Sequence, residues 1–312
     1  MVDFLLPLLQ TAMVLAFAPL VTGIIRRLKA LLQSRTGPPV LQPYYDLIKL
    51  MRKGSVVSQD ASWVSAITPY VCLASMVLAA LLVPAFLTET WGFLGDLIVL
   101  VYLFAMARFF MALAALDAGS AFGGMGSSRE MFVSSLVEPA MLLSFFSVAL
   151  LTGTTSLVSV TETLVSSGSD LVGPTLLLGL AAFLVCLLAE NARVPVDNPA
   201  THLELTMIHE AMLLEYSGKD LALMEYSSMV KLTLFITIAW SAFLPWGVAT
   251  ELTLVAVAIG LAVFLAKVLA VAVGIALIES SMAKLRLFRL PNVLTGAFIL
   301  AFLAVMSYFV LG

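Results

Sequence analysis

The sequence predicts an all-α, polytopic membrane protein with about eight transmembrane helices. Hydrophobic residues make up 62% of the 312 residues and charged residues only 11%, whereas soluble proteins hold about 45–50% apolar and about 25% charged residues. A chain this apolar cannot present a surface suited to water on most of its sides, so lipid must surround it. The apolar residues also gather in runs of about 20, the length that spans the hydrocarbon core of a bilayer.

Eight such runs follow one another, and the segments between them leave no room for a soluble domain of ordinary size. Residues 1–312 are therefore expected to form a single membrane domain. The run over 93–116 is the weakest, because it contains Asp96 and Arg108. The expected spans cover residues 4–25, 63–86, 93–116, 131–152, 171–189, 229–248, 252–278 and 290–311.

The charges of the connecting segments predict the orientation of the chain. Counted from the N-terminus, the odd-numbered segments are rich in basic residues. The charged residues of the even-numbered segments are all acidic. Positively charged loops stay in the cytoplasm during insertion, so the odd-numbered loops should be cytoplasmic and both termini should lie on the other side. The first loop alone contains Arg26, Arg27, Lys29, Arg35, Lys49, Arg52 and Lys53.

Two of the predicted cytoplasmic loops are long, over residues 26–62 and 190–228, and both are too apolar to be disordered. Prolines interrupt the first loop, and the pattern from Tyr44 to Met51 then predicts a short amphipathic helix. In the second loop, Asn198-Pro199 is typical of a helix start. The shorter segment over 117–129 contains the glycines of Gly123–Gly126 and is expected to form a flexible turn.

Several ionisable residues lie inside or at the end of the apolar runs, where charge is costly and usually faces a partner or a water-filled path. Arg108, Glu138, Lys267 and Glu279 are of this kind. One interpretation is that they form buried ion pairs that fix the register of the helices. The other is that they carry ions, for which Glu138 is suited because a buried carboxyl group with a raised pKa exchanges protons near neutral pH.

The loop over 190–228 is dense in ionisable residues that alternate with apolar ones, which indicates partial burial rather than a fully solvated surface. Close carboxylates raise one another's pKa, so a row of them can pass protons through intervening water. The two histidines do not have the spacing of a zinc motif, and both cysteines are isolated, so no metal site is expected. The ionisable residues singled out in this loop are Glu190, Arg193, Asp197, His202, Glu204, His209, Glu210 and Glu215.

The residues over 190–199 resemble the motif E-x-x-R-x-P-F-D-x-P-E-A-E-x-E-L. That motif belongs to the membrane subunit shared by respiratory complex I, where it is called subunit 1, and the energy-converting hydrogenases. Residues 215–218 are similar to the family's E-Y-S-G, residues 35–38 to its R-x-G-P and residues 46–50 to its D-x-x-K-L. Arg129 and Glu138 are nine residues apart, a spacing similar to that of an arginine and a glutamate in that family.

Other segments resemble the formate hydrogenlyase and hydrogenase-4 branch more than complex I; they cover residues 95–98, 102–110, 116–120, 127–130 and 279–287. The chain also departs from the shared motif. Ala200 and His202 stand where the family has acidic residues, and only Glu204 remains of the three. Val196 replaces the phenylalanine, and three extra residues precede Glu215.

The resemblance implies a multi-pass subunit of the inner (cytoplasmic) membrane that anchors a soluble electron-transfer arm and begins an ion path. It implies a nickel–iron centre in a hydrogenase large subunit and iron–sulfur clusters in a small subunit, with antiporter-like membrane subunits beside them. This chain itself is expected to hold no cofactor and to bind lipid but no nucleic acid. The two long loops are expected to dock the soluble arm.

The resemblance and the charge pattern together suggest roles for single residues. Ion translocation is assigned to Glu138, Glu190, Asp197, Glu204 and Glu215, with His202, His209, Glu210 and Lys267 as further candidates. The expected charge partners are Arg108, Arg129 and Arg193. Docking, or a quinone-like chamber, is assigned to Arg35, Gly37, Pro38, Asp46 and Lys49.

Three other functions remain open from the sequence. The chain could be the quinone-site subunit of a complex I-like NADH dehydrogenase, with the quinone near Arg35. It could be a passive membrane scaffold that conducts nothing. A stand-alone secondary transporter is disfavoured, because such transporters are commonly built from internal repeats and none is visible here.

Overall fold

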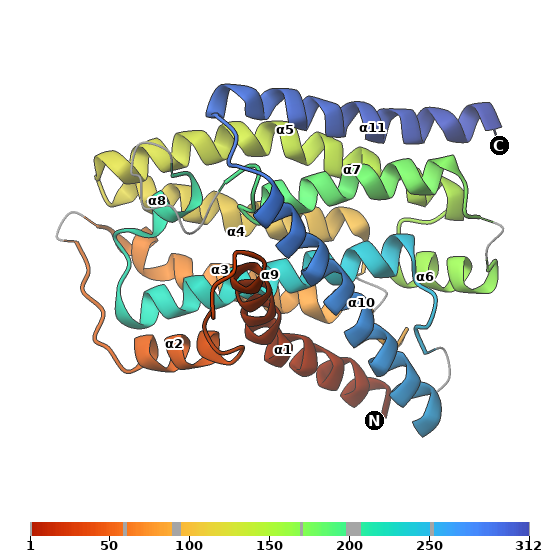
Figure 1. Cartoon of the computed structure of the whole chain (residues 1–312), viewed down its shortest axis with the longest axis horizontal. Coiled ribbons are helices and arrows are strands. Elements are labelled where there is room, and N and C mark those ends of the chain that lie inside the picture. The colour runs from red at the N-terminus through yellow and green to blue at the C-terminus, as the bar shows by residue number, and fades with distance from the viewer. Residues whose placement is uncertain are drawn as a thin grey trace.

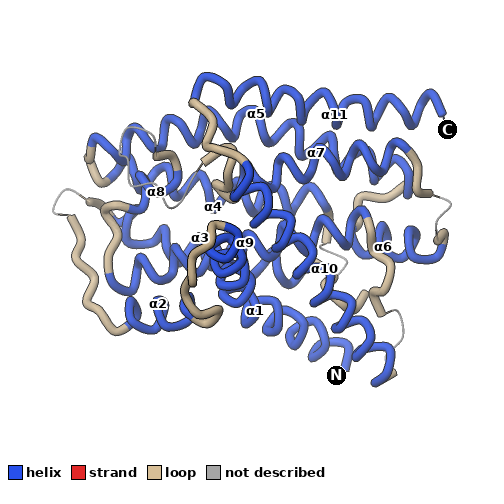
Figure 2. The backbone as a smooth tube through the Cα atoms, viewed as in Figure 1, coloured by secondary structure: helices blue, strands red, loops and turns tan. Residues whose placement is uncertain are grey.

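The structure is a computed structural model, and it describes residues 2–58, 61–88, 95–168, 171–197, 207–249 and 253–311. Over these ranges the chain folds into helices joined by loops (Figure 2). Most of the long helices run along the long axis of the molecule, and α1 and α10 cross it at an angle (Figure 1). The prediction of an all-α membrane protein is confirmed.

Seven helices in the described ranges are long and apolar enough to cross a membrane. The remaining expected span, over 171–189, forms α7 (Pro174–Glu190), whose 17 residues rise about 25 Å, slightly less than the thickness of the hydrocarbon core. Helices α5, α9 and α11 pack against α7 and bury one side of it, whereas Leu177 and Leu184 on its other side are exposed. The seven are α1 (Val2–Leu32), α3 (Trp63–Leu82), α4 (Leu97–Asp117), α5 (Ala121–Thr152), α9 (Gly218–Phe243), α10 (Leu254–Ser281) and α11 (Leu290–Leu311).

Short elements complete the fold at its two ends. The amphipathic helix predicted near Tyr44 is confirmed as α2 (Gln42–Met51). Helix α8 (His209–Leu213) lies at the same end, and the 3-10 turn η1 (Leu287–Arg289) precedes α11. At the other end, α6 (Leu157–Ser166) was not predicted. Both chain termini point toward that end, opposite α2 and α8 (Figure 1).

The expected turn over 117–129 is wrong, because α5 already begins at Ala121 and includes the four residues Gly123–Gly126. Ser120 caps this helix by accepting a hydrogen bond from the Gly123 N–H at 3.1 Å. A side chain at Gly126 would collide with Ala211 and with the carbonyl of Ile208. The glycine therefore allows α8 to approach α5 closely instead of breaking the helix.

Two further boundaries differ from the prediction. Helix α1 continues to Leu32, so the first loop is shorter than 26–62. Helix α9 begins at Gly218, so the loop expected over 190–228 ends at residue 217. Both differences have one cause: charged residues near the end of an apolar run still belong to the helix when they face the polar end of the bundle.

Phenylalanine side chains fill the centre of the bundle. Phe183 on α7 has its ring centroid 5.2 Å from that of Phe145 on α5, 5.8 Å from Phe235 and 5.6 Å from Phe243 on α9. Phe104 on α4 lies 4.7 Å from Phe235. Each such pair contributes about 0.5–1.5 kcal/mol beyond its buried area. This cluster holds together the four helices that position the site described below.

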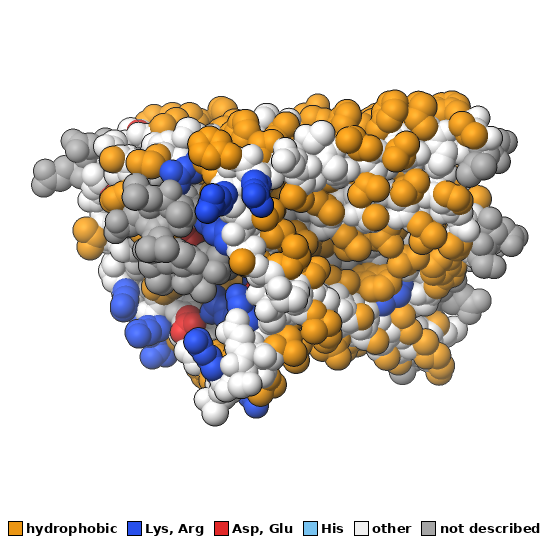
Figure 3. Space-filling view, turned by 45° about the horizontal axis from the view of Figure 1, so that its top comes forward, with side chains coloured by type: hydrophobic (Ala, Val, Ile, Leu, Met, Phe, Trp, Pro, Cys, Tyr) orange, Lys and Arg blue, Asp and Glu red, His pale blue; other side chains and the backbone are white. Residues whose placement is uncertain are grey.

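The outer surface divides into two parts. Hydrophobic side chains cover most of the visible face, and Lys and Arg side chains gather mainly at one end (Figure 3). The apolar part is the surface expected to face lipid. The charged end is formed by the regions that the sequence predicts to be cytoplasmic, and which side of a membrane it faces stays a prediction.

At the charged end, the first loop is joined to the segment before α9. The Ser217 hydroxyl accepts a hydrogen bond from the Val56 N–H at 2.7 Å and donates one to the Val56 carbonyl at 3.1 Å. The Tyr216 hydroxyl donates to the Ser65 carbonyl at 3.0 Å. Burial raises the pKa of Tyr216, so this hydroxyl stays protonated as a donor. We call residues 54–56 and 216–218 the loop clasp.

Candidate functional site

The centre of the site is a group of four charged residues from four helices, which we call the central cluster. Arg108 on α4 pairs with Glu138 on α5 and with Glu190 at the end of α7. Lys231 on α9 donates to the Glu190 carboxylate at 2.8 Å and to the Glu190 carbonyl at 2.8 Å. Two carboxylates and two cations therefore balance one another inside the bundle.

The central cluster is buried except at one side chain. Arg108 is 3% exposed and the Glu190 side chain 1%, but the Glu138 side chain is 36% exposed. Removing charges from water is expensive, and pairs of this kind persist only where their partners satisfy them. Glu138 is thus the member through which the cluster reaches the outer surface of α5.

A second network ties three parts of the charged end together. Glu279 near the end of α10 accepts from Lys29 on α1 at 3.0 Å and from Arg193, after α7, at 3.2 Å. The Glu279 side chain is only 2% exposed. This carboxylate therefore fixes the ends of α1 and α10 relative to the loop that follows α7.

Asp197 organises the same loop. It pairs with Lys284 at 2.5 Å and accepts hydrogen bonds from the N–H groups of Ile208 at 3.2 Å and His209 at 3.1 Å. The Leu285 N–H donates to the Pro195 carbonyl at 2.9 Å, which adds a backbone link. Asp197 thereby holds the start of α8 against the segment between α10 and α11.

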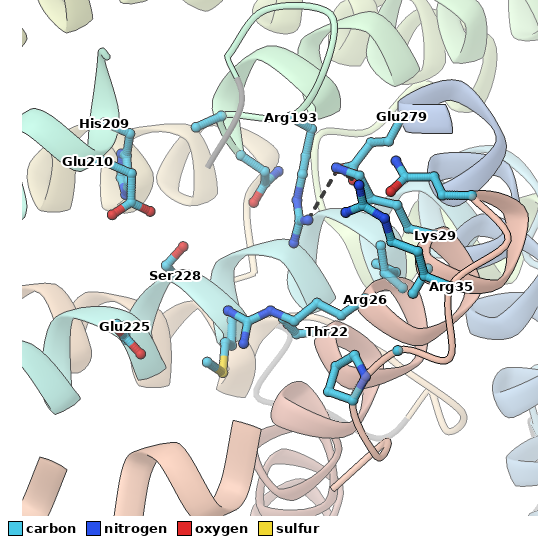
Figure 4. Close-up of a pocket in the computed structure, with 18 of the residues that line it drawn as sticks. Thr22, Arg26, Lys29, Arg35, Arg193, His209, Glu210, Glu225, Ser228 and Glu279 are labelled. Carbon is cyan, nitrogen blue, oxygen red and sulfur yellow. Dashed lines mark hydrogen bonds and ion pairs between the residues drawn. The ribbon is translucent and has the colours of Figure 1, made fainter. Parts of the chain in front are cut away.

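A chamber of about 890 Å³ lies between α1, α9, the end of α10 and residues 33–38 (Figure 4). This volume is in the range of small-molecule sites. Figure 4 shows His209 and Glu210 on one side of it, with Glu225 and Ser228 on α9. Burial lowers the pKa of His209, so its imidazole is neutral at neutral pH. The charged residues of the lining are Arg26, Lys29, Arg35, Arg193, Glu210, Glu225 and Glu279.

A small cavity of about 40 Å³ lies between the chamber and the central cluster. Asn191, His209 and Ser228 line both spaces, and the small cavity reaches Arg108, Glu190 and Lys231. The side-chain oxygen of Asn191 is buried and has no hydrogen-bond partner among the described residues. Buried polar atoms are normally satisfied by protein or water, so this oxygen marks a point where water can bind between chamber and cluster.

Several residues singled out in the sequence come together in these two spaces. Glu138 and Glu190 meet at Arg108, and Arg193 pairs with Glu279 rather than with the carboxylates of the central cluster. The predicted site residues that line the chamber are Arg35, Gly37, Pro38, Arg193, His209 and Glu210. His202 and Glu204 lie outside the described residues.

Other predicted residues lie apart. Glu215 is exposed beside a separate cavity of about 240 Å³ at the loop clasp. Lys267 on α10 donates to the Leu244 carbonyl at 2.7 Å, and its ammonium lies 5.2 Å from the Trp240 ring. Arg129 donates to the Met207 carbonyl at 2.9 Å, so its partner is a carbonyl rather than a carboxylate.

The first-loop charges also lie away from the cluster. Asp46 accepts from Gln42 at 2.8 Å and lies 3.7 Å from Arg26, which keeps its contacts local to α1 and α2. Lys49 is exposed on α2. Neither residue lines the chamber that contains Arg35.

The sequence did not single out three ionisable residues that the structure buries fully or in part. Lys231 lies inside the run over 229–248, and the signal that singled out Lys267 would have found it. Glu225 lies just before that run, on the part of α9 that was assigned to a loop. Glu130 lies between the turn expected over 117–129 and the span expected over 131–152, eight residues before Glu138 on the same helix.

Comparison with known proteins gives matches over nearly the whole chain. Residues 5–310 match the family described as NADH dehydrogenase. Formate hydrogenlyase subunit 4 of Escherichia coli K12 is 37% identical, over 97% of this chain and 98% of the relative. Hydrogenase-4 component C of the same organism is 36% identical, over 95% and 93%.

More distant proteins also match, one in sequence and one in structure. A subunit of the NADH-quinone oxidoreductase of Rubrobacter xylanophilus is 31% identical, over 74% of this chain and 72% of the relative. A chain of the membrane-bound sulfane sulfur reductase, described as an archaeal respiratory membrane complex, matches with a TM-score of 0.87 and 21% identity. That match covers 99% of this chain and 100% of the other, so the two chains have the same fold.

Proposed function

Because the chain belongs to the NADH dehydrogenase family, within the group of formate hydrogenlyase subunit 4 and hydrogenase-4 component C, we propose that it is a membrane subunit of an energy-converting hydrogenase complex. In this role it anchors a soluble electron-transfer arm and begins the path along which redox energy moves protons or sodium ions. The observation that carries the proposal is the buried central cluster. Charged residues inside a membrane protein are costly and usually mark an ion path, and this cluster gathers four of them from four helices.

The geometry supports a route from the chamber to the outer surface of α5. Protons in the chamber reach Glu190 past Ser228 and Asn191, which line both the chamber and the small cavity. Arg108 holds Glu190 and Glu138 together, so a change of charge at one carboxylate alters the attraction at the other. The partly exposed Glu138 then passes the ion to a neighbouring, antiporter-like membrane subunit.

The loop clasp is the proposed docking place of the soluble arm. Two hydrogen bonds between Val56 and Ser217 close it, and apolar side chains are exposed in and around it: Val56 is 75% exposed, Trp63 70% and Leu214 50%. Exposed apolar residues beside polar ones are typical of protein interfaces. The nickel–iron centre and the iron–sulfur clusters belong to the large and small subunits of this arm. The whole complex would lie in the inner (cytoplasmic) membrane.

A second function is favoured by one observation, the size of the chamber beside Arg35. A cavity of this volume could hold a quinone, as in a complex I-like NADH dehydrogenase. Turnover separates the two functions. A hydrogenase complex should produce or consume hydrogen with a soluble low-potential partner at a rate that quinone depletion and quinone-site inhibitors do not change. A requirement for added quinone would favour the complex I-like function.

The substitution Glu138→Gln tests the proposed ion path. It keeps the size and hydrogen bonding of the side chain but removes the group that titrates. Hydrogen turnover by the complex should persist, while the membrane potential formed in inverted vesicles is lost. Glu162→Gln, at an exposed position on α6, is the matched control and should stay coupled. Full coupling in Glu138→Gln would leave the central cluster with a structural role only.

A further inference from the structure

Glu130 on α5 is a buried carboxylate that the route described above does not use. It is 8% exposed and lies on the inward face of α5, with Ser127 and Ser134. Among the residues that the structure describes, it forms neither a hydrogen bond nor an ion pair. An ionised carboxylate without a partner is among the most expensive groups to bury, whereas burying a neutral carboxyl group costs much less.

Helix register places Glu130 next to the central cluster. The Cys186 thiol of α7 points to the Val137 carbonyl of α5, so Glu190, four residues further along antiparallel α7, lies level with residue 133. The Ser127 hydroxyl donates to the Ala112 carbonyl of α4 at 3.1 Å, so Arg108 lies level with residue 131. Both levels are within one turn of Glu130.

The other side of Glu130 faces the loop that Asp197 organises. One turn before it, Gly126 packs against Ala211 of α8. The neighbouring Arg129 donates to the Met207 carbonyl. Asp197 accepts hydrogen bonds from the N–H groups at the start of this same α8 segment. Glu130 therefore lies between the layer at the charged end and the central cluster.

Four charged groups act on Glu130 across the interior. Lys231 and Arg108 attract its negative charge, and Glu190 and Asp197 repel it. None of them reaches ion-pair distance among the described contacts of Glu130. A carboxyl group in this balance can exist in either protonation state, because neither state is locked by a direct partner.

We propose that Glu130 is a proton-carrying residue that links the charged end at Asp197 with Glu190, by a route that does not pass through the chamber. This inference rests on the proposed function. In its neutral form Glu130 gives its proton, through an intervening water, to the Glu190 carboxylate and becomes a carboxylate itself. It is then reprotonated from water on the side of Asp197, so one proton has moved inward and Glu130 has returned to its starting form.

The test uses the intact membrane complex that contains this chain, reconstituted in vesicles. Glu130→Gln removes the titrating group and buries no charge, so the complex should assemble and its hydrogen turnover with a soluble donor should persist. The rate of potential formation should fall roughly a hundredfold, the lower end of what a positioned proton-transfer group contributes. Glu130→Asp keeps a carboxyl group and should restore part of that rate, which a purely structural role would not predict.

Infrared difference spectra of the same vesicles give a second measurement that does not depend on turnover. The absorption of a protonated carboxyl group should be present in the unaltered complex and in Glu162→Gln, and should disappear in Glu130→Gln. An unchanged spectrum, or full coupling in Glu130→Gln, would overturn the role of Glu130. If Glu138→Gln is uncoupled in that same experiment, the proposed function stands and only Glu130 is rejected. Full coupling in both variants would reject the proposed function too.

Discussion

Arg108 forms ion pairs with carboxylates from two other helices, Glu138 on α5 and Glu190 on α7. Its planar guanidinium can donate to both at once, which the single ammonium of a lysine does less well. Without it, Glu190 would keep Lys231, but Glu138 would lose the only cation that the described residues provide for it. Both the stability and the charge balance of the cluster depend on this residue.

Arg108→Gln should therefore lower the stability of the protein, by about 3–5 kcal/mol if both carboxylates stay charged, since breaking a buried pair leaves an uncompensated charge. Arg108→Lys should lose less, because the positive charge remains. Thermal unfolding of the purified protein in detergent measures both. Arg27→Gln, at an exposed position on α1, is the control. Equal melting temperatures for the Arg108→Gln and Arg27→Gln variants would mean that the cluster does not stabilise the fold.

Single residues show what sequence alone can and cannot predict. Arg108, Glu138 and Glu279 stood out because they are ionisable in apolar surroundings. Their partners could not be predicted, since ion pairs between helices depend on helix rotation and register. Glu130 shows the same limit, because only the packing of α5 against α4 and α8 reveals that it faces inward.

At the scale of elements, length and hydropathy predicted every long helix, because a span must satisfy its backbone hydrogen bonds by itself. Length and hydropathy did not predict the structure where packing against a neighbouring helix determines it. The glycines of 123–126 have the composition of a turn, but α8 requires a close approach there and the helix continues. Helix α6 was missed because its 10 residues are too few for a span.

The loop clasp offers a test at this scale. Gly218 has a backbone φ of +55° and lies against the carbonyl of Gly54, so Gly218→Ala adds both backbone strain and a collision. Strain in this region costs about 1–2 kcal/mol for a residue with a side chain. The variant should melt at a lower temperature and be cut faster by protease within residues 52–58.

Gly54→Ala is the matched control for that variant. A side chain at Gly54 would meet no atom within 4 Å, so the clasp should tolerate it. If Gly218→Ala were as resistant to protease as Gly54→Ala, the clasp would not be what orders the first loop.

At the scale of the whole molecule, an apolar belt separates two ends of different character. The charged end contains the chamber, the loop clasp and most of the basic side chains, and the chain termini point to the other end (Figures 1 and 3). This arrangement agrees with an even number of crossings, with α7 counted as a crossing despite its 17 residues. The charge pattern predicts that the charged end faces the cytoplasm.

Cysteine labelling in intact cells and in inverted vesicles tests this orientation. The natural Cys72 and Cys186 are buried and should not react. A cysteine at Gly54, in the exposed first loop, should be labelled from the cytoplasmic side only. A cysteine at Ser166, exposed at the end of α6, should be labelled from the outside only. The reverse pattern would invert the assignment of every loop.

The loop clasp also orders events during biosynthesis. Val56 and Ser217, which it joins, are separated by 161 residues, and α3, α4, α5 and α7 are made between them. At about 5–20 residues per second, the first loop waits on the order of ten seconds after synthesis before its counterpart emerges from the ribosome. If the soluble arm docks at the loop clasp as proposed, its recruitment has to wait until Ser217 has been made, so chains that end before this residue should not bind the arm.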